Sequence, residues 1–497
     1  MSISSIEETS NIKKSLKVTS LFGGVQVLSI LISIIRNKCI ALLIGPVGVG
    51  FVELYNSTIR LIGTFTDFSI RVSAVRDVSV AYKSGNQQEF NRIAKVFSKL
   101  VWFTGLLGTI VCLLGAPLWS KFSFNDYSHT WQFAILSGIL LLNQLQNGKS
   151  VILQGTENYR YLAYSGVIGN IVGLFTTLPI YYIWGVDGVI PVLLLTALTS
   201  FILTYYFARK IDINDFPMLN KEAMIEGKKM LKQGFLLSVN YIYSALLFYI
   251  LRIFITNQGG VEELGLYSAG FMIVSTYVGL VFQSLSQEYY PRLSSLSLDI
   301  EKMRNAINDQ IYFSILVLGP LIALFMTCSD FLLQLLYSSR FSGASLFMAV
   351  SMLGVLFQAP SFCMVYALLA KGDNRDYLIY ETVSKTIKLF FDVGLYLMWG
   401  LTGLGIAFVI SYIYYTIQSS YVCKKKYGYT MSKANILNLA VYICVCLFSL
   451  CSFILLPLIW RLAIESVIIM ITFYYSYSKL NKILDINTFV KSKIFKK

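Results

Sequence analysis

The stretch ISIIRNKCIALLIGPVGVG, residues 32–50, decides how the fold of this sequence is interpreted. It begins as an apolar helix, carries Arg36 and Lys38 in its middle and ends in a cluster of glycines. The cluster lacks the Gly-Lys-Ser/Thr ending of a phosphate-binding loop, and it follows a helix rather than a strand. We therefore interpret it as a tight turn in which Gly45 and Pro46 end one helix before the next begins.

The rest of the chain shares the apolar character of this stretch. Of its 497 residues, 56% are hydrophobic and only 13% are charged, and the mean hydropathy is +0.65. Soluble domains contain roughly 25% charged residues, whereas here apolar runs long enough to span a bilayer recur along nearly the whole length. Backbone groups in lipid must be hydrogen-bonded within the protein, and the alternation typical of barrel strands is missing. We therefore predict an all-α polytopic membrane protein.

The apolar runs predict about fourteen transmembrane helices. Their expected ranges are 16–44, 50–72, 95–119, 129–154, 160–184, 187–208, 231–256, 264–290, 306–327, 344–370, 376–399, 402–422, 435–456 and 460–478. With the N-terminus inside, thirty of the 41 Lys and Arg residues fall in cytoplasmic loops and tails, and three fall in outer loops, Arg461 among them. Because cytoplasmic loops are enriched in Lys and Arg, we expect both termini on the cytoplasmic side of a bacterial inner membrane.

The composition argues against catalytic or metal chemistry and against a nucleic-acid partner. The eight cysteines lie mostly in apolar runs without CxxC or Cys/His spacing, and His129 is the single histidine. These residues build neither a disulfide framework nor a metal site nor a catalytic triad. The net charge of +15 follows from the basic cytoplasmic loops. We expect no enzymatic activity, no metal and no bound cofactor.

The chain also matches itself at a shift of about 215 residues. The matches are GVGFVELY (48–55) with EELGLYSAG (262–270), LQGTENYRYL (153–162) with LAKGDNRDYL (369–378), and YYIWGVDG (181–188) with YLMWGLTG (396–403); they align Gly50 with Gly265, Gly155 with Gly372, and Gly185 with Gly400. Each repeat holds six helices, and an even number keeps both in the same orientation. We predict an N-lobe over 1–220, a C-lobe over 221–430, and two further helices with a basic tail over 431–497.

Charged residues within predicted spans mark candidate functional sites, because such residues are costly in lipid. In the first predicted helix Arg36 shares a stripe with Ser29 and Ser33, whereas Lys38 points to the opposite side. The second predicted helix has one unbroken polar face, made by Glu53, Ser57, Arg60, Thr64, Asp67 and Arg71. This face either lines a cavity or forms an ion-pair seam within the lobe, with Asp67 and Arg71 paired.

The second repeat carries fewer such charges. Arg252 lies near the repeat equivalent of Arg36. In the eleventh predicted helix Lys388 and Asp392 are four residues apart, as are Glu381 and Lys385. For this helix, mutual neutralisation of the charges is the alternative to a role in a cavity.

The surplus of cations favours an anionic ligand such as phosphate or pyrophosphate, which arginine binds through forked hydrogen bonds. The candidate substrate ligands are Arg36, Arg60, Arg252 and Lys388. The candidate cavity or coupling residues are Glu53, Asp67, Arg71 and Asp392.

The segment IRNKCIALLIGPVGVGFVELYNS (35–57), followed by FNRIAKVF (90–97), resembles the opening of the Wzx-type O-antigen translocases. These proteins are lipid-linked oligosaccharide flippases of the multidrug/oligosaccharidyl-lipid/polysaccharide exporter superfamily. The turns LQGTEN (153–158) and LAKGDN (369–374) resemble the family's motif after its fourth and tenth helices. The resemblance covers essentially the whole chain, although two helices beyond the usual twelve of the O-antigen translocases are a departure.

The resemblance implies that the protein moves an undecaprenyl-pyrophosphate-linked glycan from the cytoplasmic to the outer leaflet by alternating access. In related lipid II flippases an arginine nine residues before a glycine in the first helix lines a cationic cavity, and Arg36 and Gly45 keep that spacing. The implied partners are the lipid-linked glycan, membrane lipids and other polysaccharide-assembly proteins. An H⁺ or Na⁺ gradient or the membrane potential is the implied source of energy.

Two alternatives stay open at this point. A multidrug antiporter of the same superfamily has the same fold, but its cationic substrates favour carboxylates over arginines in the cavity. A membrane polysaccharide polymerase or ligase needs a large outer loop with catalytic residues, whereas the predicted outer loops are short and the longest loop is cytoplasmic.

Overall fold

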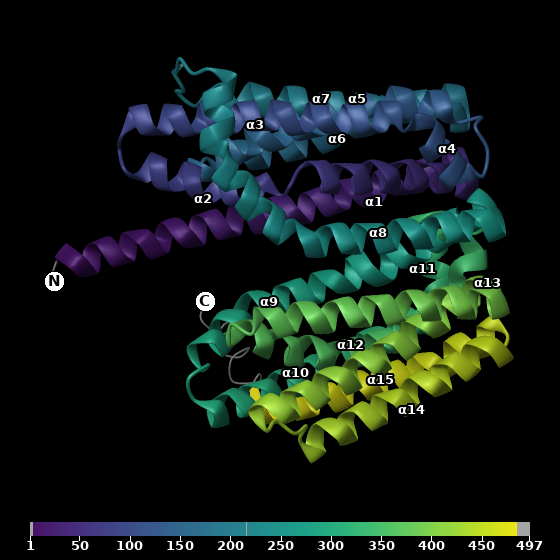
Figure 1. Ribbon diagram of the computed structural model, residues 1–497. Coiled ribbons are helices and arrows are strands. Elements are labelled where there is room, and N and C mark those ends of the chain that lie inside the picture. Colours follow the sequence, from purple (N-terminus) through teal and green to yellow (C-terminus); the bar gives the residue numbers. More distant parts are fainter. Residues whose placement is uncertain (1–2, 215, 485–497) are drawn as a thin grey trace, which may run out of the picture. The chain divides into compact units, whose positions relative to one another are not determined.

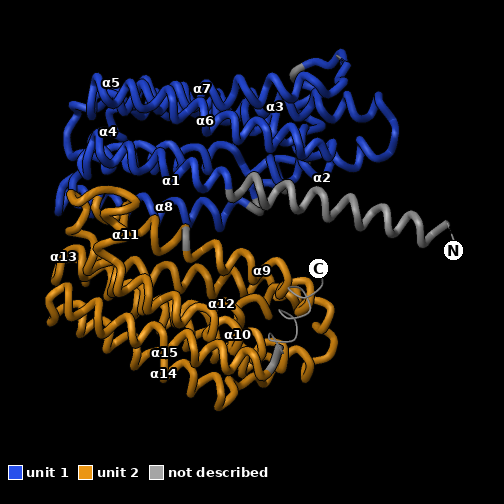
Figure 2. Tube along the Cα trace, turned by 180° about the vertical axis from the view of Figure 1, so that it is seen from behind, with its two compact units in different colours: residues 1–265 blue, residues 266–497 orange. Residues whose placement is uncertain are grey.

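A computed structural model describes residues 3–214 and 216–484, and within these ranges every regular element is a helix (Figure 1). The chain divides into two compact units, unit 1 at residues 1–265 and unit 2 at residues 266–497 (Figure 2). The all-α class predicted from the sequence is confirmed. The predicted lobes, with boundaries at 220 and 430, follow the sequence repeat rather than compactness, and they stay a prediction. Most of the predicted basic tail lies beyond residue 484, outside the described residues.

Unit 1 contains the first seven α-helices and most of the eighth. They are α1 (Ile3–Thr66), α2 (Ile70–Lys83), α3 (Gln87–Leu114), α4 (Ala116–Phe124), α5 (Thr130–Gly155), α6 (Tyr159–Trp184), the short 3₁₀ helix η1 (Gly185–Gly188), α7 (Val189–Ala208) and α8 (Asn220–Met272), whose last residues belong to unit 2. One cluster of its core is formed by apolar side chains of α1, α5, α6 and α7, with Phe133 and Leu136 fully buried, and a second is formed mainly by α2, α3 and α5.

Unit 2 begins within the last turns of α8. It holds the π-helical segment η2 (Ile273–Tyr277), α9 (Val278–Ser295), α10 (Ile300–Thr327), α11 (Ser329–Leu336), the 3₁₀ segment η3 (Ser339–Ala344), α12 (Ser345–Ala370), α13 (Asn374–Tyr427), α14 (Lys433–Leu455) and α15 (Leu458–Leu484). Helices α10 and α12 include the most deeply buried of its apolar segments.

Nine segments of the described residues are long and apolar enough to cross a membrane. Four of them are 39 to 58 residues long, namely Leu28–Thr66, Tyr159–Ala208, Ser238–Ser295 and Asn374–Tyr427. A bilayer crossing takes about 20 residues, so each of these four is long enough for two crossings joined by a break. Four double and five single crossings cover every predicted span except the one at 129–154. That span coincides with α5, which is not among the nine segments, so the count of fourteen stays a prediction.

Glycines make these breaks, in backbone conformations that other residues avoid. Helix α1 breaks at Gly45 (φ 64°, ψ −169°) and α8 at Gly260 (φ 82°, ψ 173°). The chain breaks again at Gly185 after α6 (φ 54°, ψ −129°) and at Gly400 within α13 (φ 55°, ψ −137°). The two halves of α1 run in opposite directions (Figure 1). The predicted turn is thus confirmed, and Pro46 opens the second half, where its missing N–H is tolerated.

The backbone carries the internal repeat that the sequence predicts. Three left-handed positions recur 215 residues later, and the pairs are Gly45 with Gly260, Glu157 with Gly372, and Gly185 with Gly400. Helices α5 and α12 end with the same separation, at Gly155 and Ala370. The structure corrects one detail of the sequence alignment, because the counterpart of Gly372 is Glu157 rather than Gly155.

The reversal points of α1 and α8, both within unit 1, touch through their backbones. A Cβ atom on Gly50 would lie 2.0 Å from the carbonyl oxygen of Val261, and one on Gly265 would lie 1.9 Å from that of Pro46. The contact is reciprocal, because Pro46 and Val261 are equivalent in the repeat, as are Gly50 and Gly265. Only glycine allows two backbones to approach this closely.

The helix predicted over 50–72 ends early. Helix α1 ends at Thr66, because Asp67 Oδ1 accepts a hydrogen bond from the backbone N–H of Ser69 at 2.8 Å, a local bond that competes with the helix. The polar face therefore stops at Asp67, and Arg71 belongs to α2. The described residues form no ion pair between Asp67 and Arg71, so the structure does not support the seam that was considered through that pair as the alternative to a cavity.

The close crossing predicts that Gly50→Ala and Gly265→Ala each destabilise the protein. The added methyl group meets a backbone carbonyl that cannot rotate away, and overpacking of this kind costs about 1–3 kcal/mol. The melting temperature of the purified protein in detergent measures the effect. Gly166→Ala is the matched control, since a Cβ there meets nothing within 4 Å. Equal melting temperatures for all three variants would contradict the crossing.

Candidate functional site

The second half of α1 and helix α5 enclose a polar cavity of about 440 Å³ within unit 1. Its lining consists of Asn56, Ile59, Arg60, Gly63, Thr64 and Asp67 from α1 and its C-terminal end, and Leu140, Asn143, Gln144 and Asn147 from α5. The α1 residues that line it recur every three or four positions, which places them on one face of the helix. Three residues of the predicted polar face, Arg60, Thr64 and Asp67, therefore line this cavity, whereas Glu53 and Ser57 do not.

Several hydrogen-bonding groups of this cavity are available to a ligand. Within the described residues, the side chains of Asn56, Arg60, Asn143 and Asn147 make no hydrogen bond or ion pair. The Arg60 residue is exposed. By contrast, the buried Gln144 is already engaged, because its Nε2 donates to the Thr104 hydroxyl at 2.8 Å. One guanidinium and three amides thus form a surface rich in hydrogen-bond donors.

Arg36 does not line this cavity but faces α6. Its Nη1 lies 3.5 Å from the place that a Cβ of Gly173 would occupy, so the glycine leaves room for the guanidinium. Tyr181, two turns further along α6, is close enough for an electrostatic interaction. Between them, the buried Thr177 hydroxyl has no hydrogen-bond partner in the described part of the chain. In that same part Arg36 forms no ion pair, so its charge is not neutralised by a carboxylate.

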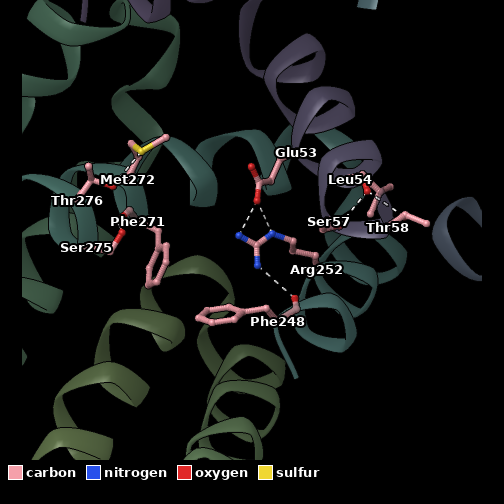
Figure 3. A network of polar contacts seen from close by, with 10 residues as sticks. All are labelled: Glu53, Leu54, Ser57, Thr58, Phe248, Arg252, Phe271, Met272, Ser275 and Thr276. Atoms are coloured by element: carbon pink, nitrogen blue, oxygen red, sulfur yellow. Dashed lines mark hydrogen bonds and ion pairs between the residues drawn. The ribbon is translucent and has the colours of Figure 1, made fainter. Parts of the chain in front are cut away.

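Arg252 is held by Glu53, as Figure 3 shows. Its Nε and Nη2 lie 2.6 Å and 2.5 Å from Glu53 Oε1, and its Nη1 donates to the carbonyl oxygen of Phe248 at 3.2 Å. The Arg252 residue is only 7% exposed. Glu53 of the second predicted helix therefore takes part in an ion pair, but this pair joins α1 to α8 and is not the seam within one lobe that was considered for that helix. Arg252 can reach a substrate only if this pair opens.

In unit 2, both predicted ion pairs of α13 are present. Lys388 Nζ lies 2.6 Å from Asp392 Oδ2, and Lys385 Nζ lies 3.0 Å from Glu381 Oε2. Asp392 is only 3% exposed, and the Lys388 ammonium lies 5.9 Å from the centre of the Phe408 ring. The two candidate residues therefore neutralise each other in this structure.

Sequence reasoning missed the amides of α5 and two charged residues near the C-terminus. The signal for the amides was the Asn-x-x-x-Asn spacing of residues 143 and 147, which places both on one helix face. Glu465 is fully buried, and its Oε2 accepts hydrogen bonds from Ser449 at 2.7 Å and Thr327 at 3.2 Å. Arg461, expected in an outer loop, instead lies in α15, where its Nη2 contacts Asp330 at 2.9 Å.

These features define a polytopic α-helical membrane protein built from an internal repeat of broken helices, with arginines in its polar interior. The family model described as polysaccharide biosynthesis protein matches residues 15–297, more than half of the chain, and the chain belongs to this family. It is 24% identical over 413 residues to a putative O-antigen transporter of Shigella flexneri, covering 80% of this chain and 94% of that protein. It is 22% identical over 395 residues to a lipid III flippase of Escherichia coli strain K12, covering 76% and 91%.

Solved structures share the fold. A lipid II flippase, MurJ, in an inward closed conformation matches 93% of this chain and 99% of its own with a TM-score of 0.69 at 15% identity. An inward-facing multidrug resistance transporter of the MATE family in the MOP superfamily matches 81% of this chain and 94% of its own, with a TM-score of 0.66 at 16% identity. The predicted resemblance to lipid-linked oligosaccharide flippases is confirmed by the family match and the named relatives, and these structures share the fold.

We expect the Glu53–Arg252 pair to show strong energetic coupling. Removing one partner leaves a buried charge without compensation, which costs about 3–5 kcal/mol, whereas removing both is better tolerated. Melting temperatures of Glu53→Gln, Arg252→Met and the double variant complete a double-mutant cycle.

The exposed Lys83–Glu157 pair provides the matched cycle for this measurement. Its side chains are 62% and 37% exposed, so its coupling energy should stay below about 1 kcal/mol. A coupling between Glu53 and Arg252 no larger than this would show that the buried pair does not hold α8 on α1.

Proposed function

We propose that this protein is a flippase that moves an undecaprenyl-pyrophosphate-linked oligosaccharide across the bacterial inner membrane, from the cytoplasmic to the outer leaflet. Family membership and the relatives named as an O-antigen transporter and a lipid III flippase support this class of transport. The observation that carries the proposal for the site is the donor-rich cavity around Arg60. The proposed activity is transport without a covalent step.

The chemistry of the cavity suits the polar head of such a substrate. A pyrophosphate carries charge that the forked donors of a guanidinium match, and Arg60 has no carboxylate partner among the described residues. The amides of Asn56, Asn143 and Asn147 offer both donors and acceptors, which sugar hydroxyl groups need. In this proposal Arg60 binds the pyrophosphate, the amides contact the first sugar, and the polyprenyl chain stays in lipid.

Arg36 provides a second cation in the same unit. It lies on the first half of α1, whereas Arg60 lies on the second half, and the break at Gly45 separates them. An unneutralised guanidinium in an apolar segment is costly, and packing of the apolar core does not explain its presence there. We assign to Arg36 a role in guiding the anionic head group along unit 1.

Energy coupling is assigned to the carboxylates. Asp67 is the one carboxylate in the described lining of the cavity, so protonation or ion binding there would change the charge next to Arg60. In unit 2 the Lys388–Asp392 pair is the candidate for a second coupling site. An H⁺ or Na⁺ gradient or the membrane potential is the proposed drive. The Lys and Arg distribution supports an orientation with both termini in the cytoplasm.

A multidrug antiporter is the alternative, because members of that class share this fold. Its substrates are cations, which a cavity containing an unneutralised guanidinium repels. The cavity around Arg60 holds one cation and one carboxylate, and its remaining polar groups are neutral. These two charges cancel formally, so the preference for an anionic head over a cationic drug rests on the Arg60 guanidinium, which forms no ion pair with Asp67 in the described residues.

The test is surface display of a polysaccharide in a host whose own flippase is deleted, with the protein level of each variant measured. Arg60→Gln and Arg36→Gln should each reduce display about tenfold or more, because a charge-assisted hydrogen bond contributes about 1.5–3 kcal/mol. Arg76→Gln, an exposed arginine of α2, is the matched control and should retain full display. Full display in the Arg36→Gln/Arg60→Gln double variant would refute the role of these arginines, and extrusion of a cationic dye would favour the antiporter.

A further inference from the structure

A second cavity, of about 600 Å³, lies between α3, α5 and α7 of unit 1. Three cations line it, Lys95 of α3, Lys149 of α5 and Arg209 at the end of α7, and its described lining contains no Asp or Glu. It shares no lining residue with the cavity around Arg60. The structure therefore holds a basic cavity that is separate from the proposed transport site.

Two of these cations lie close to the same aromatic ring. The Lys149 ammonium lies 5.4 Å and the Arg209 guanidinium carbon 5.8 Å from the centre of the Tyr205 ring. Neither Lys149 nor Arg209 forms an ion pair with any described residue. Lys149 is six residues from the end of α5, which the sequence predicts to span the membrane, and an unneutralised ammonium is costly there. Contact with the electron-rich face of the ring offsets only part of that free-energy cost.

The same cavity also has an apolar part. Val101 and Trp102 of α3, Leu145 of α5 and Phe201 of α7 belong to its lining, and Trp102 is 48% exposed. Exposed Trp and Tyr residues in membrane proteins gather at the level of the lipid head groups. Cationic groups next to apolar, outward-facing side chains are complementary to a molecule with an anionic head and a hydrocarbon tail.

We propose that this cavity binds the head group of an anionic phospholipid of the cytoplasmic leaflet. Lys95 and Arg209 lie at the helix ends that the Lys and Arg distribution assigns to the cytoplasm, and basic pockets between helices on that side bind anionic head groups. The phosphate lies between Lys149 and Arg209, and the first part of an acyl chain packs on Trp102. The proposal shares the predicted orientation with the proposed function but not its transport step.

Thermal stability of the purified full-length protein in detergent tests the site without measuring transport. Phosphatidylglycerol should raise the melting temperature of the natural protein by several degrees more than phosphatidylethanolamine does. The Lys149→Gln/Arg209→Gln variant should lose this difference. Lys479→Gln is the matched control, since that lysine also lies over a tyrosine, 5.6 Å from the ring of Tyr475, but outside the cavity, and it should keep the full difference.

Two results of this experiment would overturn the proposal. An undiminished difference in the Lys149→Gln/Arg209→Gln variant places the lipid elsewhere. Inorganic phosphate that stabilises the natural protein as much as phosphatidylglycerol would show that the cavity is a site for free phosphate rather than for lipid. Neither outcome bears on whether the protein transports a glycan.

A second measurement does not depend on the folding of the charge variant. In nanodiscs, phosphatidylglycerol with brominated acyl chains should quench tryptophan fluorescence of the natural protein more than brominated phosphatidylethanolamine does. Trp102→Phe should remove this difference, because the bound chain lies against that indole. Equal quenching by the two lipids in the natural protein, or an unchanged difference in Trp102→Phe, would refute the site.

Discussion

The backbone contact between the reversal points of α1 and α8 is the constraint from which the arrangement of unit 1 follows. Gly50 packs against the carbonyl of Val261 and Gly265 against that of Pro46, so the two backbones meet directly at these glycines. The close approach at this end brings the second half of α1 alongside the first half of α8. It places Glu53, less than one turn beyond Gly50, within reach of Arg252. Tyr249 follows on α8 and packs against Leu61 of α1.

The ion pair that this contact permits determines which cations are left for a substrate. Glu53 neutralises Arg252, and in unit 2 Asp392 neutralises Lys388. Arg36 and Arg60 keep their charge without a carboxylate partner among the described residues. The four candidate substrate ligands thus divide into two that form ion pairs in the structure and two that are available to an anionic head group. Cations inside the predicted spans can thus either form structural ion pairs or bind a substrate. Whether a carboxylate lies within ion-pair distance decides which of these two roles a given cation has.

Much of the fold could be predicted from the sequence, because it depends on local properties of the chain. Apolar runs of bilayer length predicted the long apolar helices, and the glycines near residues 45, 185 and 400 predicted breaks whose positive φ angles recur across the repeat. Pairs four residues apart on one helix, such as Lys388 with Asp392, also follow from helical geometry alone. These predictions needed no knowledge of how one helix packs on another.

The candidate site was less predictable, because it depends on contacts between distant segments. Glu53 and Arg252 are 199 residues apart, and nothing in either helix alone specifies that they meet. Arg36 was expected in the same cavity as Arg60, but the direction in which it points is set by the space that Gly173 leaves on α6. The end of α1 was misplaced because one hydrogen bond from the Ser69 N–H to Asp67 outweighed the helical pattern.

Helix α5 shows how a membrane helix can serve two polar sites at once. One face presents Asn143 and Asn147 to the cavity around Arg60, and another presents Lys149 to the basic cavity near α7. This polar content explains why α5 is not among the nine apolar segments, although it packs within unit 1 with Phe133 and Leu136 fully buried. A helix with two polar faces is stable in a membrane only where protein or a bound polar molecule covers both. The composition of α5 thus fits a polar environment on each side, and the proposed substrate cavity and the proposed lipid site would provide one each.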